Sequence, residues 1–271
     1  MKNIARVLTI AGSDSGGGAG IQADLKTITV LGGYGMSAIT ALTAQNTQGV
    51  RAVHPVPPDF VAAQIEAVLS DIGADAVKTG MLAGPEIVAV VAEAIQKHRM
   101  DKVVIDPVMV AKSGDALLSP DGEKAMLEIM VPLACVLTPN IPEAERMTGL
   151  TIKGIEQMEQ AAAALAERGA RHVLVKGGHL PDAATDVLYD GDRFHHLSAE
   201  RIATKNTHGT GCTYSAAIAT GLAQGLDVLG AVQMAKAYVT KAIQHSLALG
   251  RGAGPLDHAA AARSRTRRSR S

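Results

Sequence analysis

Short apolar runs alternate with amphipathic segments from the N-terminus to about residue 250. The short runs have the length and composition of buried strands. In the longer segments, apolar residues recur every three or four positions, which is the periodicity of amphipathic helices. Regular alternation of this kind is typical of βαβ units. We therefore expect an α/β protein with a central, mostly parallel sheet covered by helices.

The predicted strands and helices fill the chain without an internal repeat or a linker before residue 250. Strands are expected at 7–11, 36–44, 76–81, 102–107, 136–140 and 172–178, with an extended segment at 50–56 and a hairpin over 186–197. Helices are expected after the glycine-rich segment 12–20 and at 57–69, 85–97, 141–143 onward, 155–168, 211–225 and 227–249, with another beginning at Ser119. We predict one domain over residues 1–258, a flap at 108–118 and a disordered Arg/Ser-rich tail at 259–271.

Composition and charge narrow the classes of partner. Aromatic residues make up 2% of the chain and Trp is absent, so stacking platforms for single-stranded nucleic acid are not expected. Five arginines and no acid occur in 259–271, and the remainder has an excess of acidic residues. A binder of nucleic acid is therefore not expected, and RNA or membrane contact by the tail is the alternative. Two cysteines make no disulfide framework. No 18-residue apolar run or signal region occurs, so we expect a cytoplasmic protein without membrane contact.

The segment 206–212 is the first candidate for chemistry. Gly209, Thr210 and Gly211 form a small-residue loop that leads through Cys212 into an Ala-rich helix. Backbone N–H groups at a helix N-terminus attract a phosphate or a developing anion. The same field is expected to lower the pKa of the Cys212 thiol. The alternative is a capped helix whose cysteine is a small buried hydrophobe.

Other candidate residues fall where predicted strands end, namely Gly12, Gln45, Met81, Asp106, Asn140 and Lys176. Ligands of open α/β sheets bind beyond the carboxyl ends of the strands, so we expect one common site. The residue types favour phosphoryl transfer. Lys176 is expected to steady nucleotide phosphates, and Asp106 with the Asn140-x-x-Glu143 pair to hold Mg²⁺, partly through its waters. Asp24 lies beside the apolar stripe of the helix that follows residues 12–20. It is either a partnered buried acid or a ligand group.

Several familiar motifs are missing. There is no G-x-x-x-x-G-K-[ST] sequence, and residues 16–20 do not fit a dinucleotide-binding G-x-G-x-x-G. His195 and His196 alternate faces on a strand and cannot chelate a metal, and the other histidines lack zinc spacing. His208 is a candidate base, although a histidine beside a helix start more often caps or packs.

Five stretches resemble the bacterial hydroxymethylpyrimidine/phosphomethylpyrimidine kinases of thiamine biosynthesis, within the ribokinase-like superfamily. They lie at 11–24, 41–47, 77–81, 106–114 and 207–213. The resemblance covers about residues 5–258. It implies a three-layer α/β/α sandwich and a homodimer. It also implies an ATP- and Mg²⁺-dependent kinase, with a monovalent cation as a further candidate cofactor. Such a kinase phosphorylates 4-amino-5-hydroxymethyl-2-methylpyrimidine and then its monophosphate.

The resemblance also implies roles for the candidate residues. Gln45 recognises the aminopyrimidine edge, in a pocket lined by Gly12, Asp24, Met81 and Val108. ATP is bound by Lys176, Asp106, Asn140 and Thr210. Cys212 stands where sugar kinases of the superfamily carry an aspartate base, so it is the candidate base of the first step, beside Gly209, Gly211 and Lys176. The second step needs no base, because a phosphate monoester is already an anion.

The nearest alternative is a pyridoxal or pyridoxine kinase on the same scaffold. Such relatives carry a second cysteine in the flap, where this chain has Ala111, and they lack the run Ala44-Gln45-Asn46. Both departures favour the pyrimidine substrate. A non-catalytic nucleotide- or vitamin-binding module is an alternative from another class. It would not need the thiol of Cys212.

Overall fold

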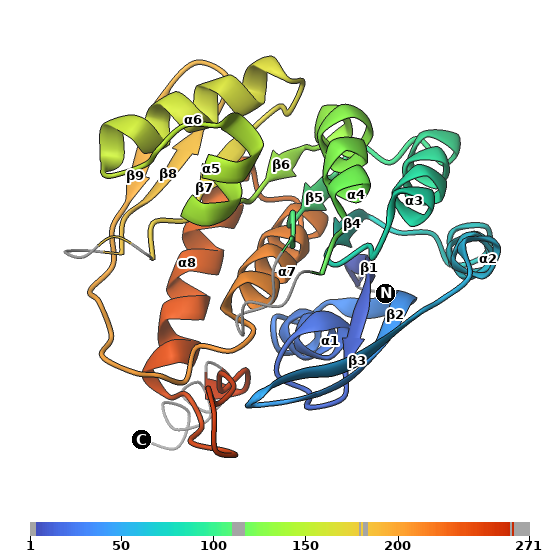
Figure 1. Cartoon of the computed structure of the whole chain (residues 1–271), viewed down its shortest axis with the longest axis horizontal. Coiled ribbons are helices and arrows are strands. Elements are labelled where there is room, and N and C mark those ends of the chain that lie inside the picture. Colours follow the sequence, from blue (N-terminus) through green and yellow to red (C-terminus); the bar gives the residue numbers. More distant parts are fainter. Residues whose placement is uncertain (1–3, 110–116, 179, 181–183, 261, 263–271) are drawn as a thin grey trace.

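The computed structural model describes residues 4–109, 117–178, 180, 184–260 and 262 (Figure 1). Most of the predicted flap at 108–118, including Ala111, and most of the predicted tail at 259–271 lie outside the described residues. The strands are β1 (Arg6–Asp14), β2 (Tyr34–Asn46), β3 (Gly49–Pro55), β4 (Ala76–Thr79), β5 (Val103–Ile105), β6 (Val136–Leu137), β7 (Val173–Val175), β8 (Asp186–Tyr189) and β9 (Phe194–Leu197).

The strands of the described residues form one nine-stranded sheet in the order β3-β2-β1-β4-β5-β6-β7-β8-β9. The central strands from β2 to β7 pair in parallel. The pairings of β2 with β3, of β7 with β8 and of β8 with β9 are antiparallel. The expected mostly parallel sheet and the hairpin at 186–197 are confirmed.

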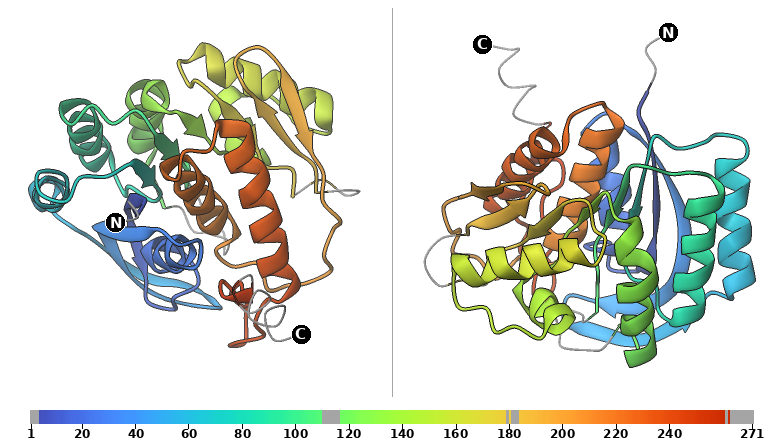
Figure 2. Two further views of the ribbon diagram at one scale, coloured as in Figure 1. Left: turned by 180° about the vertical axis from the view of Figure 1, so that it is seen from behind. Right: turned by 90° about the horizontal axis from the view of Figure 1, so that it is seen from above.

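Helices cover both faces of this sheet (Figure 2). They are α1 (Gly20–Val30), α2 (Pro58–Leu69), α3 (Pro85–Lys97), α4 (Pro120–Ala125), α5 (Ile141–Thr148), α6 (Ile155–Glu167), α7 (Thr210–Ala223) and α8 (Val228–Gln244), with a π-helical turn at Met126–Met130 and a 3₁₀ turn at Val131–Leu133. One core joins α1, α7 and α8 to the sheet, and a second joins α2, α3, α5 and α6 to it. The three-layer α/β/α architecture is therefore confirmed.

Neighbouring residues of a strand enter opposite cores. Val7 packs with α7 and α8, whereas Leu8 packs with α2 and α3. The same alternation separates Val104 from Val103 and Ile105. Because both faces are covered, these strands read as continuous apolar runs rather than as alternating ones.

The carboxyl ends of the parallel strands lie along one edge of the sheet. The chain passes from β1 to β2 on one side and later returns to β4 on the other side of β1. Such a reversal opens a crevice beyond the strand ends. The pairing of β1 with β2 also shifts register between Ala11 and Ser13, which face Ile39 and Leu42. The extra residue is in β2, so Gly12 lies opposite a bulge at the mouth of this crevice.

The last helix is shorter than predicted. Leu247 and Leu249 continue the apolar pattern, yet α8 ends at Gln244. The N–H of Leu247 donates to the carbonyl of Pro255 at 2.9 Å, so the returning segment replaces the helical hydrogen bond. None of the described helices is long and apolar enough to span a bilayer.

Candidate active site

A cavity of about 680 Å³ lies beyond the carboxyl ends of the parallel strands. It brings together nearly all of the candidate residues, although they are spread over two hundred positions of sequence. Those that line it are Gly12, Gln45, Met81, Asp106, Val108, Asn140, Glu143, Lys176, Gly209, Thr210, Gly211 and Cys212. The expectation of one common site is confirmed for these residues.

Lys176 and Asp106 form an ion pair on the cavity wall, with 2.8 Å between Nζ and Oδ1. Burial acts to lower the pKa of Lys176, but the carboxylates of Asp106 and Glu143 outweigh it and raise that pKa. The ammonium therefore stays charged. A Cβ built on Gly211 would lie 3.4 Å from this Nζ and 3.5 Å from Asp106 Oδ2. These are ordinary van der Waals distances, so the helix start lies in direct contact with the ion pair.

Asn140 and Glu143 form a capping box at the start of α5. The Asn140 side chain accepts the N–H of Glu143 at 2.9 Å, and Glu143 Oε2 accepts the N–H of Asn140 at 2.7 Å. Their spacing thus has a local cause in helix capping. Burial, with the charge of Asp106 adding to it, raises the pKa of Glu143 to about 7 against the lowering effects of Lys176 and the Asn140 N–H.

The cavity contains carboxylates suited to a hydrated cation. Among the described residues, no three His, Cys, Asp or Glu side chains gather as a complete metal site. Asp106 and Glu143 are nevertheless near enough for the charge of one to act on the other. Magnesium typically takes one or two carboxylates together with substrate phosphates and waters. The carboxylates of Asp106 and Glu143 on this wall of the cavity are therefore a donor set that suits Mg²⁺.

The segment before α7 holds the helix start close to the first glycine-rich loop. Gly209 has a φ of +81°, and a Cβ there would lie 1.8 Å from the carbonyl oxygen of Gly18. Only glycine allows this approach. No side chain caps the helix, and the N–H of Thr210 donates to the carbonyl of Thr207 at 3.3 Å. The N–H groups of Gly211 and Cys212, with the helix dipole behind them, remain to meet an anion in the cavity. The geometry is suited to an anion.

The Cys212 thiol is not acidified in this structure. Burial raises its pKa to about 11, and the carboxylates of Asp24 and Asp106 act in the same direction. Lys78 and a hydrogen bond from the backbone N–H of Gly20 lower it by less. The expectation of a lowered thiol pKa was wrong, because the helix start places the thiol, half-buried, near two acids.

Asp24 lies beneath the cavity rather than in its wall. Its side chain is fully buried, accepts a hydrogen bond of 2.6 Å from the Thr9 hydroxyl and pairs with Lys78 at 2.9 Å. The prediction that Asp24 lines the substrate pocket is wrong, and the alternative of a partnered buried acid is correct. Lys78 borders the cavity from beneath, since its side chain has no exposed surface either, and sequence reasoning missed it. A lysine inside the apolar run Ala76–Thr79 was the available indication.

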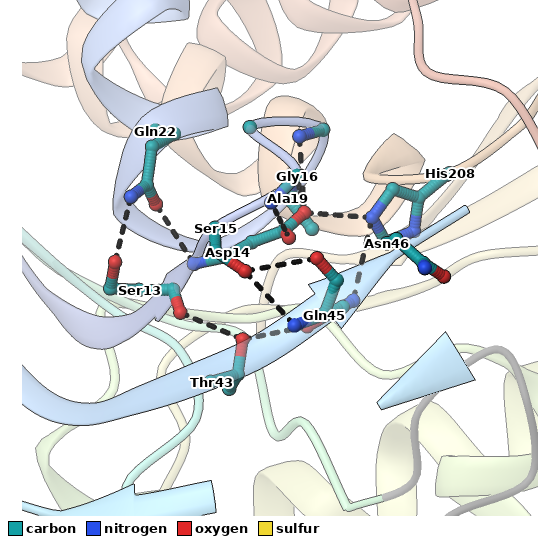
Figure 3. A network of polar contacts seen from close by, with 12 residues as sticks. Ser13, Asp14, Ser15, Gly16, Ala19, Gln22, Thr43, Gln45, Asn46 and His208 are labelled. Atoms are coloured by element: carbon teal, nitrogen blue, oxygen red, sulfur yellow. Dashed lines mark hydrogen bonds and ion pairs between the residues drawn. The ribbon is translucent and has the colours of Figure 1, made fainter. Parts of the chain in front are cut away.

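A polar network joins the two glycine-rich loops to Gln45 (Figure 3). Asp14 Oδ2 lies 2.8 Å from Nε2 of His208. The same ring nitrogen lies 3.5 Å from Nε2 of Gln45. Asp14 was not singled out from the sequence, where it stands among many small polar residues. His208 does pack at the helix start, and its ring also reaches the cavity.

A second polar cluster at the cavity was also missed. Asp186 accepts hydrogen bonds from Lys236 at 2.7 Å, from Tyr214 at 3.0 Å and from the N–H of Gly177 at 2.9 Å. These residues come from β8, α8 and α7. No spacing along the chain links them, so only the packing of the helices on the sheet reveals the cluster.

Known proteins resemble this chain along most of its length. A family model described as phosphomethylpyrimidine kinase matches residues 14–257. The hydroxymethylpyrimidine/phosphomethylpyrimidine kinase of Rhizobium meliloti is 54% identical, with a match that covers 94% of this chain and 97% of that protein. The thiamine biosynthesis bifunctional protein ThiED of Geobacter sulfurreducens is 55% identical over 94% of this chain, which spans about half (52%) of that protein's length.

A solved structure shares the fold closely. The ADP complex of Bacillus subtilis pyridoxal kinase superposes with a TM-score of 0.90 and is 42% identical, with a match that covers 96% of this chain and 99% of that one. At this identity and coverage, the likeness extends to the whole sheet and both helical layers.

Proposed function

Since this chain belongs to the phosphomethylpyrimidine kinase family, we propose that its cavity phosphorylates 4-amino-5-hydroxymethyl-2-methylpyrimidine and then the monophosphate. ATP is the phosphoryl donor, and the diphosphate product serves thiamine biosynthesis. One observation carries the proposal. Gln45, which can pair with the aminopyrimidine edge, lines the same cavity as the Lys176–Asp106 ion pair and the start of α7.

The substrate end of the cavity is formed by Gln45 with Gly12, Met81 and Val108. A Cβ on Gly12 would lie 3.2 Å from the sulfur of Met81, so the glycine lets the Met81 thioether pack close against the end of β1 as one wall for a flat ring. The Gln45 amide offers one donor and one acceptor side by side. An amino group next to a ring nitrogen presents the complementary pair. Asp24 lies beneath these residues and does not touch the substrate.

At the transfer end, charge neutralisation does most of the catalysis. Lys176 stays charged and steadies the nucleotide phosphates, with Asn140 and Thr210 beside it on the cavity wall. The backbone N–H groups at Gly209 to Cys212 stabilise the charge on the phosphoryl group in flight. Positioning and charge stabilisation of this kind are what phosphoryl transfer chiefly requires.

Asp106 and Glu143 are the residues that would hold Mg²⁺, partly through its waters. Bound there, the ion neutralises phosphate charge and orients the transferred group. A monovalent cation is a further candidate cofactor.

Cys212 is proposed as the base of the first phosphorylation. The hydroxymethyl group must lose its proton as the bond to phosphorus forms, and the thiol lies at the helix start where that group would meet the phosphate. The neutral resting thiol must first lose its own proton. The monophosphate is already an anion, so the second phosphorylation relies on Lys176 and the loop amides.

A pyridoxal-type alcohol is the second candidate substrate, because the superposed Bacillus subtilis structure is a pyridoxal kinase. Identity to the hydroxymethylpyrimidine/phosphomethylpyrimidine kinase of Rhizobium meliloti is higher, 54% against 42%, which favours the pyrimidine. The test measures ADP release with hydroxymethylpyrimidine, its monophosphate and pyridoxal in parallel. We expect the first two to be preferred. Equal or better turnover of pyridoxal refutes the substrate assignment.

We further propose a cytoplasmic homodimer with one kinase domain at 1–258, against which Ala260 also packs, since it is buried and its N–H donates to the carbonyl of Asp257. The edge strand β3, with Val53 40% exposed, offers unpaired backbone groups that a second copy could cover. Light scattering of the purified protein tests the dimer, and a monomeric mass at micromolar concentration would refute it.

A further inference from the structure

The Asp14 carboxylate fixes the proton on the His208 ring. Its two oxygens accept the N–H groups of Gly16 at 2.8 Å, Gly18 at 3.0 Å and Ala19 at 2.9 Å. Although burial raises the pKa of Asp14, the bond from His208 and these backbone bonds outweigh it, and the pKa is lowered. An ionised carboxylate only accepts hydrogen bonds. His208 therefore carries a proton on Nε2 and donates it to Asp14 across 2.8 Å.

The proton on His208 decides between the two orientations of the Gln45 amide (Figure 3). If Gln45 Nε2 points toward the His208 ring, two N–H donors, Gln45 Nε2 and His208 Nε2, face each other at 3.5 Å. In that orientation the Thr43 hydroxyl, which has a single proton, is the donor to both Ser13 O at 2.9 Å and Gln45 Oε1 at 3.1 Å. Both conflicts vanish when the amide turns by half a turn. Gln45 Oε1 then faces the ring N–H, and Gln45 Nε2 donates to Thr43, which keeps its proton for Ser13.

We infer that His208, held by Asp14, is a positioning residue that turns the Gln45 carbonyl oxygen toward its own ring and the Gln45 N–H toward Thr43. This inference deepens the proposed function and rests on it, because it assigns how Gln45 meets the substrate. The amide then has one lone pair free on the His208 side and one N–H free on the Thr43 side. A ligand must place an amino group toward His208 and the adjacent ring nitrogen toward Thr43.

The same residue connects substrate recognition to the transfer loop. His208 directly precedes Gly209, and a Cβ on Gly18 would lie 2.4 Å from the His208 ring. Asp14 holds the N–H groups of the loop that contains Gly18. The group that orients Gln45 is thus one residue from the backbone that receives the phosphate.

The experiment compares His208→Ala and His208→Gln with wild type, and uses His54→Ala as a matched control because His54 is an exposed residue of β3. The KM for hydroxymethylpyrimidine should rise roughly tenfold in His208→Ala, the equivalent of one hydrogen bond. The KM for ATP should stay within about twofold. Glutamine can again donate an N–H to Asp14, so His208→Gln should recover most of the loss.

An analogue without the 4-amino group separates recognition from general damage. Its inhibition constant, measured against hydroxymethylpyrimidine, should change by less than about twofold in His208→Ala, because the lost contact is the one to the amino group. An equal loss for both ligands, or an unchanged KM, overturns the inference. If the wild-type protein does not phosphorylate the pyrimidine, that result contradicts the proposed function and not this inference.

A measurement without substrate keeps the inference testable in that case. The side-chain ¹⁵N resonance of Gln45, assigned by its absence in Gln45→Ala, should shift in His208→Ala and return toward its wild-type position in His208→Gln. A resonance that is unaffected by His208→Ala contradicts the inference whatever the substrate of the enzyme.

Discussion

Lys78 Nζ lies 2.9 Å from Asp24 Oδ2, and both side chains are completely shielded from solvent. The pair sits between β4 and α1, near enough to Cys212 for its charges to act on the thiol. Burial raises the pKa of Asp24 against the lowering effect of Lys78, whereas the carboxylate of Asp24 outweighs burial at Lys78 and raises the lysine pKa. The cavity floor therefore contains a charged pair whose members depend on each other.

Replacement of Lys78 by Met should lower the free energy of unfolding by about 3–5 kcal/mol, because it leaves Asp24 as an uncompensated buried charge. The double variant Lys78→Met with Asp24→Asn should recover much of that loss, since it removes both charges. Urea denaturation of the two single variants and the double variant measures the coupling. Strictly additive losses would mean that the ion pair contributes nothing to the folded state.

A base with a pKa near 11 gives the first phosphorylation a steep pH dependence. At pH 7 only about one Cys212 thiol in 10⁴ is ionised, so the rate should rise roughly tenfold per pH unit from pH 7 to pH 9. The second phosphorylation should lack this rise, and Cys212→Ala should impair it far less than the first. Separate rates with each substrate provide the test. A first step that is flat over this range would assign the catalysis to the loop amides instead.

Lys176→Met should reduce the kcat of both phosphorylations on the order of 10²–10³-fold, because it removes a buried charge aimed at the transferred group. It should also destabilise the fold by about 3–5 kcal/mol, since Asp106 loses its partner. Lys97→Met is a matched control, as its ion pair with Glu66 is exposed, and neither kcat nor the unfolding midpoint should change. A normal kcat in Lys176→Met would exclude the phosphate-binding role.

His258 should make the protein sensitive to mild acid. Its ring is buried against the Thr213 hydroxyl, and burial, with Lys26 adding to it, lowers the pKa of His258 to about 4. The unfolded chain takes up this proton near pH 6.5 and the folded chain only near pH 4. Stability is therefore complete above pH 6.5 and falls toward pH 4, by at most about 1.4 kcal/mol per pH unit. His258→Gln should flatten that slope relative to wild type, whereas exposed His245→Gln should not.

The sequence predicted the layers and the edge of the sheet that holds the site. Val103 to Ile105 and Val173 to Val175 are continuous apolar runs, and Val7 to Ala11 is interrupted by Thr9 alone, as suits strands that are covered on both faces. Asp106 and Lys176 follow such runs directly, and Asn140 comes three residues after the end of Val136–Leu137. Their convergence could be predicted because parallel strands end at one edge. The motifs in the glycine-rich loops also indicated the family.

Tertiary structure decided what the alternation of strands and helices leaves open. A charged side chain within a buried strand, such as Lys78, has no local partner, because Asp24 is 54 positions away. The pKa of Cys212 depends on burial and on two acids from other elements, which no helix-terminus rule includes. His208 and Asp14, 194 positions apart, meet only because α7 packs against the loop that follows β1. Local pattern thus determines elements and strand ends, whereas burial and long-range pairing determine the charge state of each group in the site.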